Sequence, residues 1–261
     1  MKKLINFISL LTLIIFLAAS CTFIKKPEIS GTGSTSPDNT SSADLQSTPA
    51  SSAAFLTSSE TANNVAAASS KPDNSPIIKN DAAGIPDEVL YKVILAELNK
   101  KPDGAFTENE AESIVFLSYG FQKDKIKDIT GIDKLKNLTA LHITDNEITD
   151  FTPVLNLKKL KTLNLSSNKI SDISAAAQLK WLVTINFSYN IISGLTPLAD
   201  LQNLKELNLW HNNIKDVTPL TNLKNLEVLN LESNYLNMSD NTTINNVNLL
   251  RNKIKYFSLG L

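Results

Sequence analysis

The sequence predicts an α/β solenoid, in which short parallel strands stack side by side along one face of a coiled chain. Three observations lead to this fold class. Leucines recur with a fixed 22-residue period, a short segment of alternating apolar and polar residues lies within each period, and an asparagine follows that segment. A single coil of this kind cannot bury its own leucines, so neighbouring coils must stack to form one continuous apolar core.

Each repeat is expected to contain a strand, a turn and a connecting segment. Stretches such as LNLSSN alternate in the manner of a half-buried strand. The asparagine side chain should point inward and bond to backbone groups of the turn. The Asp, Ser or Thr and Pro residues that follow favour a capped 3₁₀ or extended segment on the convex face. The first leucine and the asparagine of the five in-phase repeats are Leu135, Leu157, Leu179, Leu201 and Leu223, and Asn146, Asn168, Asn190, Asn212 and Asn234.

The chain before the first complete repeat predicts a helical cap over residues 81–116. IPDEVLYKVILAELNK has the apolar spacing of a helix, and TENEAESI begins with the Thr-x-x-Glu pattern of a capping box. Between them, residues 99–110 resemble an EF-hand loop. Lys101 stands where a calcium ligand is needed, so a turn between two helices is the preferred interpretation.

The repeats are expected to fill residues 117–261, with irregular copies at both ends. At the N-terminal end, FQKDKIKDITGI keeps the phase of a sixth, degenerate repeat. The matching pairs, each separated by one full period, are Phe121 with Ile143 and Ile126 with Ile148. At the C-terminal end, NNVNLLRNKIKYF is interpreted as a shortened repeat, in which Leu249 follows Leu231 by less than one period.

A 22-residue period of the form L-x-x-L-x-x-L-x-L-x-x-N identifies the leucine-rich repeat. The segment LTNLKNLEVLNLESN, together with the helical segment upstream, resembles the internalin-like leucine-rich repeat proteins of bacterial surfaces. The resemblance implies an arc whose parallel sheet lies on the concave face. It also implies a binding surface for a protein or a glycan.

The N-terminal region, residues 1–80, predicts export and a membrane anchor. Lys2 and Lys3 precede an apolar run that is short for a transmembrane helix and typical of a signal peptide, residues 1–20. The run ends in LAASC, which resembles the lipobox of bacterial lipoproteins and implies that Cys21 is acylated at the cell surface. The alternative is an ordinary secretory signal with an incidental cysteine. Residues 21–80 are rich in Ser, Thr, Ala and Pro and predict a disordered tether.

Composition and spacing exclude several classes of function. The formal net charge of −1 lacks the basic surplus of a nucleic-acid-binding protein, and one cysteine cannot form a disulfide within the chain. The two histidines, His142 and His211, lie three repeats apart, roughly 15 Å at about 4.8 Å per strand. They cannot share a metal ion or a substrate atom. We therefore expect a monomer with no enzymatic activity, no metal and no cofactor.

The variable positions of the predicted strands indicate the ligand-binding surface. LNLWHNN places Trp210 and His211 where the sister segments carry Ser, Thr, Asp, Glu or Tyr. Trp210 cannot point into the core, because Leu207 and Leu209 occupy the inward phase. Trp and Tyr are favoured anchors in protein interfaces, and stacking on a sugar ring is equally compatible. The residues predicted to contact the ligand are Trp210, Tyr189, His211, Glu206, Glu232, His142 and Asp145.

Two alternatives explain the same residues without a ligand. Tyr189 and Trp210 can form a cross-strand aromatic pair that only covers the sheet. The asparagines that precede the second leucine of each strand can hydrogen-bond to one another as a ladder, which is the preferred interpretation for them. That column consists of Asn164, Asn186, Asn208, Asn230 and Asn248.

The sequence therefore favours a lipid-anchored binding module that recognises a protein or glycan through its concave face, in adhesion or in contact with a host or envelope component. The competing hypothesis is a structural spacer or envelope assembly protein without a defined ligand. Neither hypothesis involves nucleic acid.

Overall fold

The computed structural model describes residues 73–260. The predicted signal peptide, Cys21 and most of the predicted tether lie outside the described residues, as does Leu261. Among residues 73–260, no helix combines the length and the apolar composition that crossing a bilayer requires.

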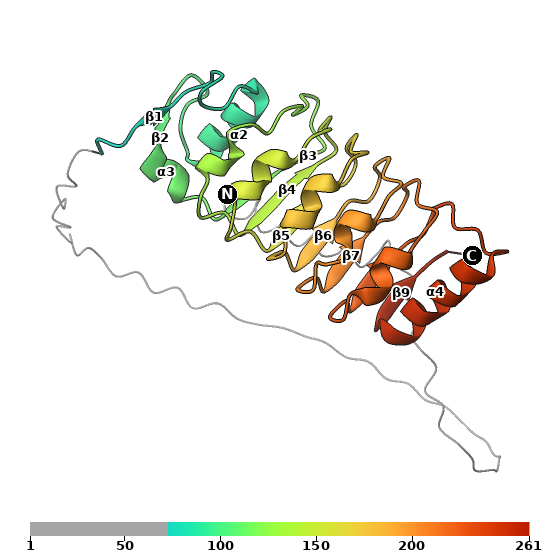
Figure 1. The fold of residues 1–261 in the computed structure, drawn as a ribbon. Coiled ribbons are helices and arrows are strands. Elements are labelled where there is room, and N and C mark those ends of the chain that lie inside the picture. Colours follow the sequence, from blue (N-terminus) through green and yellow to red (C-terminus); the bar gives the residue numbers. More distant parts are fainter. Residues whose placement is uncertain (1–72, 261) are drawn as a thin grey trace, which may run out of the picture. The chain divides into compact units, whose positions relative to one another are not determined.

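Seven short strands form one parallel sheet, and their order in the sheet is their order along the chain (Figure 1). Each strand therefore pairs only with the repeat before it and the repeat after it, which is the architecture of a solenoid. The predicted fold class is confirmed. The strands are β3 (Phe116–Gly120), β4 (Ala140–Thr144), β5 (Thr162–Asn164), β6 (Thr184–Asn186), β7 (Glu206–Asn208), β8 (Val228–Asn230) and β9 (Tyr256–Ser258).

The leucine columns form the core, as the period predicts. Leu163, Ile185 and Leu207 face one another in register across β5, β6 and β7, and each is almost fully buried. Short 3₁₀ helices connect the asparagine turns back to the next strand, and Figure 1 shows them as a row of short coiled ribbons beside the strands. They are η1 (Ile132–Lys134), η2 (Thr152–Asn156), η3 (Ser174–Gln178), η4 (Thr196–Leu198) and η5 (Thr218–Asn222).

The asparagine column joins each repeat to its predecessor. The Asn190 Oδ1 atom accepts a hydrogen bond from the Ile170 backbone N–H at 2.9 Å. Its Nδ2 atom donates to the carbonyl oxygens of Leu165 at 3.0 Å and Phe187 at 3.1 Å. Asn168 makes the equivalent bonds one repeat earlier. The prediction that these side chains point inward and satisfy the turn is confirmed.

The N-terminal cap contains the two predicted helices, α2 (Glu88–Glu97) and α3 (Glu108–Glu112), and a small antiparallel pair, β1 (Ile77–Ile78) and β2 (Phe106–Thr107). The predicted capping box is present, since the Thr107 and Glu110 side chains each accept from the other residue's backbone N–H. Residues 77–78 fall inside the range predicted for the tether. The predicted boundary therefore lies too late in the chain, because such a short strand leaves little hydrophobic pattern in the sequence.

The first repeat contains two extra residues in its turn. Ile126 is in phase as predicted, because its N–H donates to Asn146 Oδ1 at 2.8 Å, as the N–H of Ile148 does to the next asparagine. The expected pairing of Phe121 with Ile143 is wrong. Tyr119 lies opposite Ile143 in the sheet, and Phe121 is 72% exposed. The insertion thus bulges outward at the turn and leaves the strand register intact.

The C-terminal end is not a shortened repeat. Residues 241–253 form a helix, α4 (Asn241–Lys253), whose N-cap Asp240 accepts from the Thr243 N–H at 2.7 Å. Leu249 is exposed on this helix, and Asn248 also lies on it, so neither belongs to the sheet. The last strand, β9, pairs Phe257 with Leu229, so the final step is longer than the repeat period. Val247 and Leu250 are buried with the spacing of one helix face.

Candidate functional site

A left-handed residue ends each strand segment and fixes the backbone of the candidate site. Positive φ angles of 53° to 56° recur at the same position of successive repeats. Small polar residues tolerate this conformation, whereas a bulky side chain such as tyrosine adopts it at a cost in free energy. The residues concerned are Phe121, Asp145, Ser167, Tyr189, His211 and Ser233.

Tyr189, Trp210 and His211 lie together at the ends of β6 and β7, and we call them the aromatic cluster. The ring centroids of Tyr189 and Trp210 are 4.7 Å apart with the planes at 62°, and those of Tyr189 and His211 are 4.8 Å apart at 35°. The Trp210 Nε1–H donates to Ser233 Oγ at 3.2 Å, which fixes the indole. Tyr189 remains 40% exposed. The cluster is an ordered apolar surface that solvent can reach.

The two predicted glutamates lie at different ends of their strands. Glu206 begins β7, so it lies about 13 Å from Trp210 at about 3.3 Å per residue along the chain. Glu232 follows β8 and lies nearer the cluster, but its carboxylate accepts a hydrogen bond from Ser258 Oγ. Of the two glutamates, only Glu232 therefore lies near Trp210.

His142 and Asp145 lie apart from the aromatic cluster, two strand steps from Tyr189, or about 10 Å. His142 is only 8% exposed, and its ring packs edge-on against Phe116 at 5.2 Å. Burial lowers the pKa of His142 below its usual value, which favours the neutral imidazole. Asp145 forms an ion pair with Lys125 at 2.6 Å. Neither side chain adds to the aromatic surface.

The strand asparagines have a local structural role. Asn208 Oδ1 accepts from the Trp210 backbone N–H at 3.0 Å, and Asn186 and Asn230 make the same bond to the N–H two residues on. These amide oxygens therefore satisfy their own turns, and the expected ladder of amide-to-amide bonds is not what holds them. The bond to Asn208 therefore helps to hold the backbone of Trp210 in place.

The sequence reasoning missed two exposed apolar residues in the turns that follow the strands. Ile191 is 52% exposed and Tyr235 is 66% exposed, and each directly follows an asparagine of the buried column. Their backbone N–H groups bond to the preceding repeat, so their positions are fixed. The signal was available, because Lys169 and Asn213 occupy the same column in neighbouring repeats. An apolar side chain there has no packing role in the repeat.

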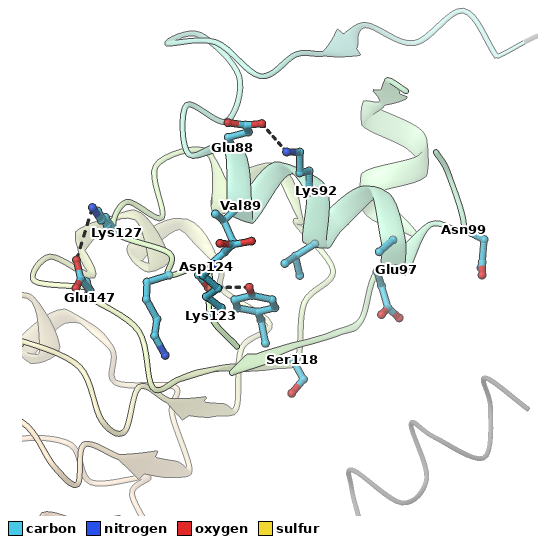
Figure 2. A pocket seen from close by; sticks show the side chains of 14 residues that line it. Glu88, Val89, Lys92, Glu97, Asn99, Ser118, Lys123, Asp124, Lys127 and Glu147 are labelled. Carbon is cyan, nitrogen blue, oxygen red and sulfur yellow. Dashed lines mark hydrogen bonds and ion pairs between the residues drawn. The ribbon is translucent and has the colours of Figure 1, made fainter. Parts of the chain in front are cut away.

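A groove of about 1190 Å³ lies between α2 and the first repeat (Figure 2). Its charged residues largely neutralise one another. Lys92 pairs with Glu88 at 2.5 Å and Lys127 with Glu147 at 3.7 Å, as the dashed lines in Figure 2 show. The groove therefore selects no ligand by charge. Over residues 73–260, no group of three or more His, Cys, Asp or Glu side chains is arranged to hold a metal ion.

Comparisons with known proteins agree with this geometry. Sequence models of the leucine-rich repeat family match residues 134–150, 158–200 and 203–223, and no curated protein matches. The crystal structure of internalin C2 from Listeria monocytogenes is 34% identical, with a TM-score of 0.59, over 67% of this chain and 74% of that chain. Internalin F from the same organism is 31% identical, with a TM-score of 0.53, over 66% of this chain and 55% of that chain.

Such relatives are surface or secreted proteins, and the family consists generally of binding proteins without enzymatic activity. A protein-binding repeat surface is therefore the general function that the comparisons support. The repeat period, the single parallel sheet, the helical cap and the similarity to internalin C2 lead to one conclusion: this chain belongs to the internalin family of leucine-rich repeat proteins.

Proposed function

We propose that the chain is a surface-displayed binding module that recognises a protein partner through the aromatic cluster and its apolar neighbours. The observation that carries the proposal is Tyr189. It holds a left-handed backbone conformation that Asp or Ser occupies in three of the other repeats and Phe121 or His211 in the remaining two, and its ring is exposed. Strain of this kind persists where surrounding structure enforces it, and it concentrates at functional sites.

The composition of the surface favours a protein over a glycan. Exposed Ile191 and Tyr235 extend the cluster with apolar area that has no packing role in the repeat, and apolar patches of this kind mark protein contacts. The Tyr189 and Trp210 rings meet edge to face at 62°, so they do not form one continuous flat surface. Stacking of a sugar ring uses a flat aromatic face, whereas a protein partner can contact rings at an angle. Glycan binding remains the second outcome of the experiment below.

The N-terminal region supports display at a membrane surface. LAASC before a Ser- and Thr-rich segment suggests a lipid on Cys21, a signal peptide over residues 1–20 and a tether between Cys21 and the helical cap. Several acyl chains on one residue anchor a protein durably. The tether would then hold the repeats away from the bilayer. A spacer without a ligand is the competing function, and it requires no particular geometry at Tyr189 or Trp210.

The test compares partner retention by the full chain and two variants. Immobilised wild-type protein, Trp210→Ala and the control Lys215→Ala are probed with surface-protein extracts and with a glycan array. Trp210→Ala should reduce affinity by about 2–4 kcal/mol, the range for hot-spot aromatics, and leave unfolding nearly unchanged. Lys215 is exposed outside the cluster, so its variant should retain the partner. Equal retention by all three proteins would refute the proposal, and retention of sugars alone would replace the protein partner by a glycan.

A further inference from the structure

The opposite edge of the sheet carries a line of lysines. Because the strands are parallel and stacked, residues that precede them lie along one edge, while the aromatic cluster follows them at the other edge. The residue after the first leucine of each repeat is lysine in four of the five in-phase copies. Successive members are about 4.8 Å apart. This column consists of Lys136, Lys158, Lys180, Gln202 and Lys224.

The position next to this column carries an asparagine that bonds to the preceding repeat in three repeats, but Lys159 or Trp181 in the other two. Asn203 and Asn225 donate through Nδ2 to the backbone carbonyl of the preceding repeat, each at 2.7 Å, and Asn137 makes the equivalent bond to Glu112 at 2.8 Å. Lys159 and Trp181 occupy the same position in the two intervening repeats. Lys159 Nζ donates instead to Asn137 Oδ1 at 2.6 Å, whereas Trp181 Nε1 is buried without a hydrogen-bond partner among the described residues. Trp181 thus departs from the locally favoured residue without a compensating bond, and such departures point to function.

Trp181 organises the lysines around it. The Lys158 Nζ atom lies 4.1 Å from the centroid of the Trp181 ring, a cation–π contact. The Lys161 Nζ atom donates to the Trp181 carbonyl oxygen at 3.3 Å. The indole packs partly against the core, so it holds these amines at a fixed place on the surface. We call Lys158, Lys159, Lys161, Lys180 and Trp181 the basic edge patch.

The lysines of the basic edge patch have no acidic partners within residues 73–260. All four are exposed, and none lies within 4.0 Å of a carboxylate there. Elsewhere along the same edge, Lys136 pairs with Glu112 at 3.0 Å and Lys205 with Glu227 at 3.3 Å, whereas Lys224 has no carboxylate within 4.0 Å in the described part of the chain. Four lysines without an ion pair therefore gather around Trp181.

We propose that the basic edge patch binds an anionic polysaccharide, a sugar chain with regularly spaced phosphate, sulfate or carboxylate groups. Lys158 and Lys180 lie one repeat apart with Lys159 and Lys161 beside them, so a linear polymer that runs along the solenoid can meet several amines in turn. A membrane would need a broad basic face, yet the two repeats after Trp181 expose Glu206 and Glu227. A nucleic-acid site would normally accompany a basic surplus, and the net charge is −1.

The experiment measures binding of the full chain to heparin, poly(glycerol phosphate), polygalacturonate and neutral dextran at several salt concentrations. At least one anionic polymer should bind and dextran should not, and the three anions identify the charged group. Lys158→Gln/Lys180→Gln should lower the slope of log affinity against log salt by roughly 2, about one per lysine. Gln202 in the same column shows that the fold accepts glutamine there. Trp181→Asn restores the asparagine bond and should also weaken binding.

The matched control is Lys123→Gln/Lys215→Gln, which removes the same charge from exposed positions outside the patch. If this control weakened polymer binding equally, the overall charge of the protein and not the basic edge patch would govern binding, and the proposal would be overturned. Binding to no anionic polymer, or tighter binding to single-stranded DNA or anionic vesicles, would overturn it as well. Trp210→Ala separates the two sites: it should leave polysaccharide binding unchanged. Loss of that binding in Trp210→Ala would move the ligand to the aromatic cluster and refute the basic edge patch.

Discussion

Replacing Asn190 by leucine should destabilise the repeat array strongly. The side chain is 6% exposed and accepts from the Ile170 N–H at 2.9 Å while donating to the Leu165 and Phe187 carbonyls. Leucine has a similar size but satisfies none of these groups. Each buried polar group left without a partner costs about 1–3 kcal/mol. Since the Leu165 and Phe187 carbonyls also accept from Asn168 and Asn212, the Ile170 N–H carries most of the loss, and the free energy of unfolding should fall by about 1–3 kcal/mol.

Urea denaturation followed by circular dichroism measures this change against two reference variants. Asn186→Ala removes one acceptor from the Ser188 N–H at a partly exposed position and should cost about 1 kcal/mol. The exposed Asn213 bonds through its backbone N–H, so Asn213→Ala should be nearly neutral. If Asn190→Leu costs no more than Asn213→Ala, the asparagine column is not what joins the repeats.

Three further predictions concern other parts of the chain. Gly194→Asp should add about 0.5–1 kcal/mol of stability. A Cβ at this position meets nothing within 4 Å, and the equivalent aspartates of other repeats cap the N–H two residues on. An unchanged urea midpoint at high salt would contradict this prediction. Cys21→Ser should move the protein from the membrane fraction to the soluble or secreted fraction, and unchanged partition would exclude lipidation. Hydrogen bonds from the Thr243 backbone hold the pKa of Asp240 below its usual value. The cap therefore contributes above the ordinary aspartate range and is lost as pH falls through the lowered pKa. The protection factors of the α4 amides, which correct for the intrinsic pH dependence of exchange, should fall there, and pH-independent protection factors would exclude the cap.

The repeat period predicted the strands and their register because every column has a fixed physical role. Leucine fills the core, asparagine satisfies the turn, and alternation places Trp210 outside. The C-terminal helix α4 escaped prediction because a helix and a shortened repeat contain a similar number of apolar residues. Only the spacing of the buried residues distinguishes them, and in α4 it is the spacing of a helix. The predicted position of Phe121 is wrong for another reason. Two inserted residues shift the phase of the repeat within a turn, and a turn has no regular pattern of buried residues that would reveal the shift.

The candidate site was predictable only where strand geometry governs it. Tyr189 and His211 are neighbours because the register places them one repeat apart, and Trp210 directly precedes His211, which the sequence shows directly. The left-handed conformation of Tyr189 belongs to a turn, and strand alternation does not specify it. The burial of His142 depends on contact with Phe116, which lies in the neighbouring strand and out of phase with the repeat period, and no periodic pattern reveals such a contact.

The asparagine bonds run in one direction along the chain, and this restricts how such a protein changes its length. The N–H groups of Ile126, Ile148 and Ile170 are each satisfied by an asparagine that belongs to the following repeat. Duplication or loss of one whole repeat unit re-forms the same bonds at the new junction. Loss of half a unit would leave a buried N–H group without a hydrogen-bond acceptor. Evolution can therefore lengthen or shorten this protein in whole repeats, moving surface residues by one strand spacing at a time. Smaller insertions survive where the first repeat carries its own, in the solvent-facing turn.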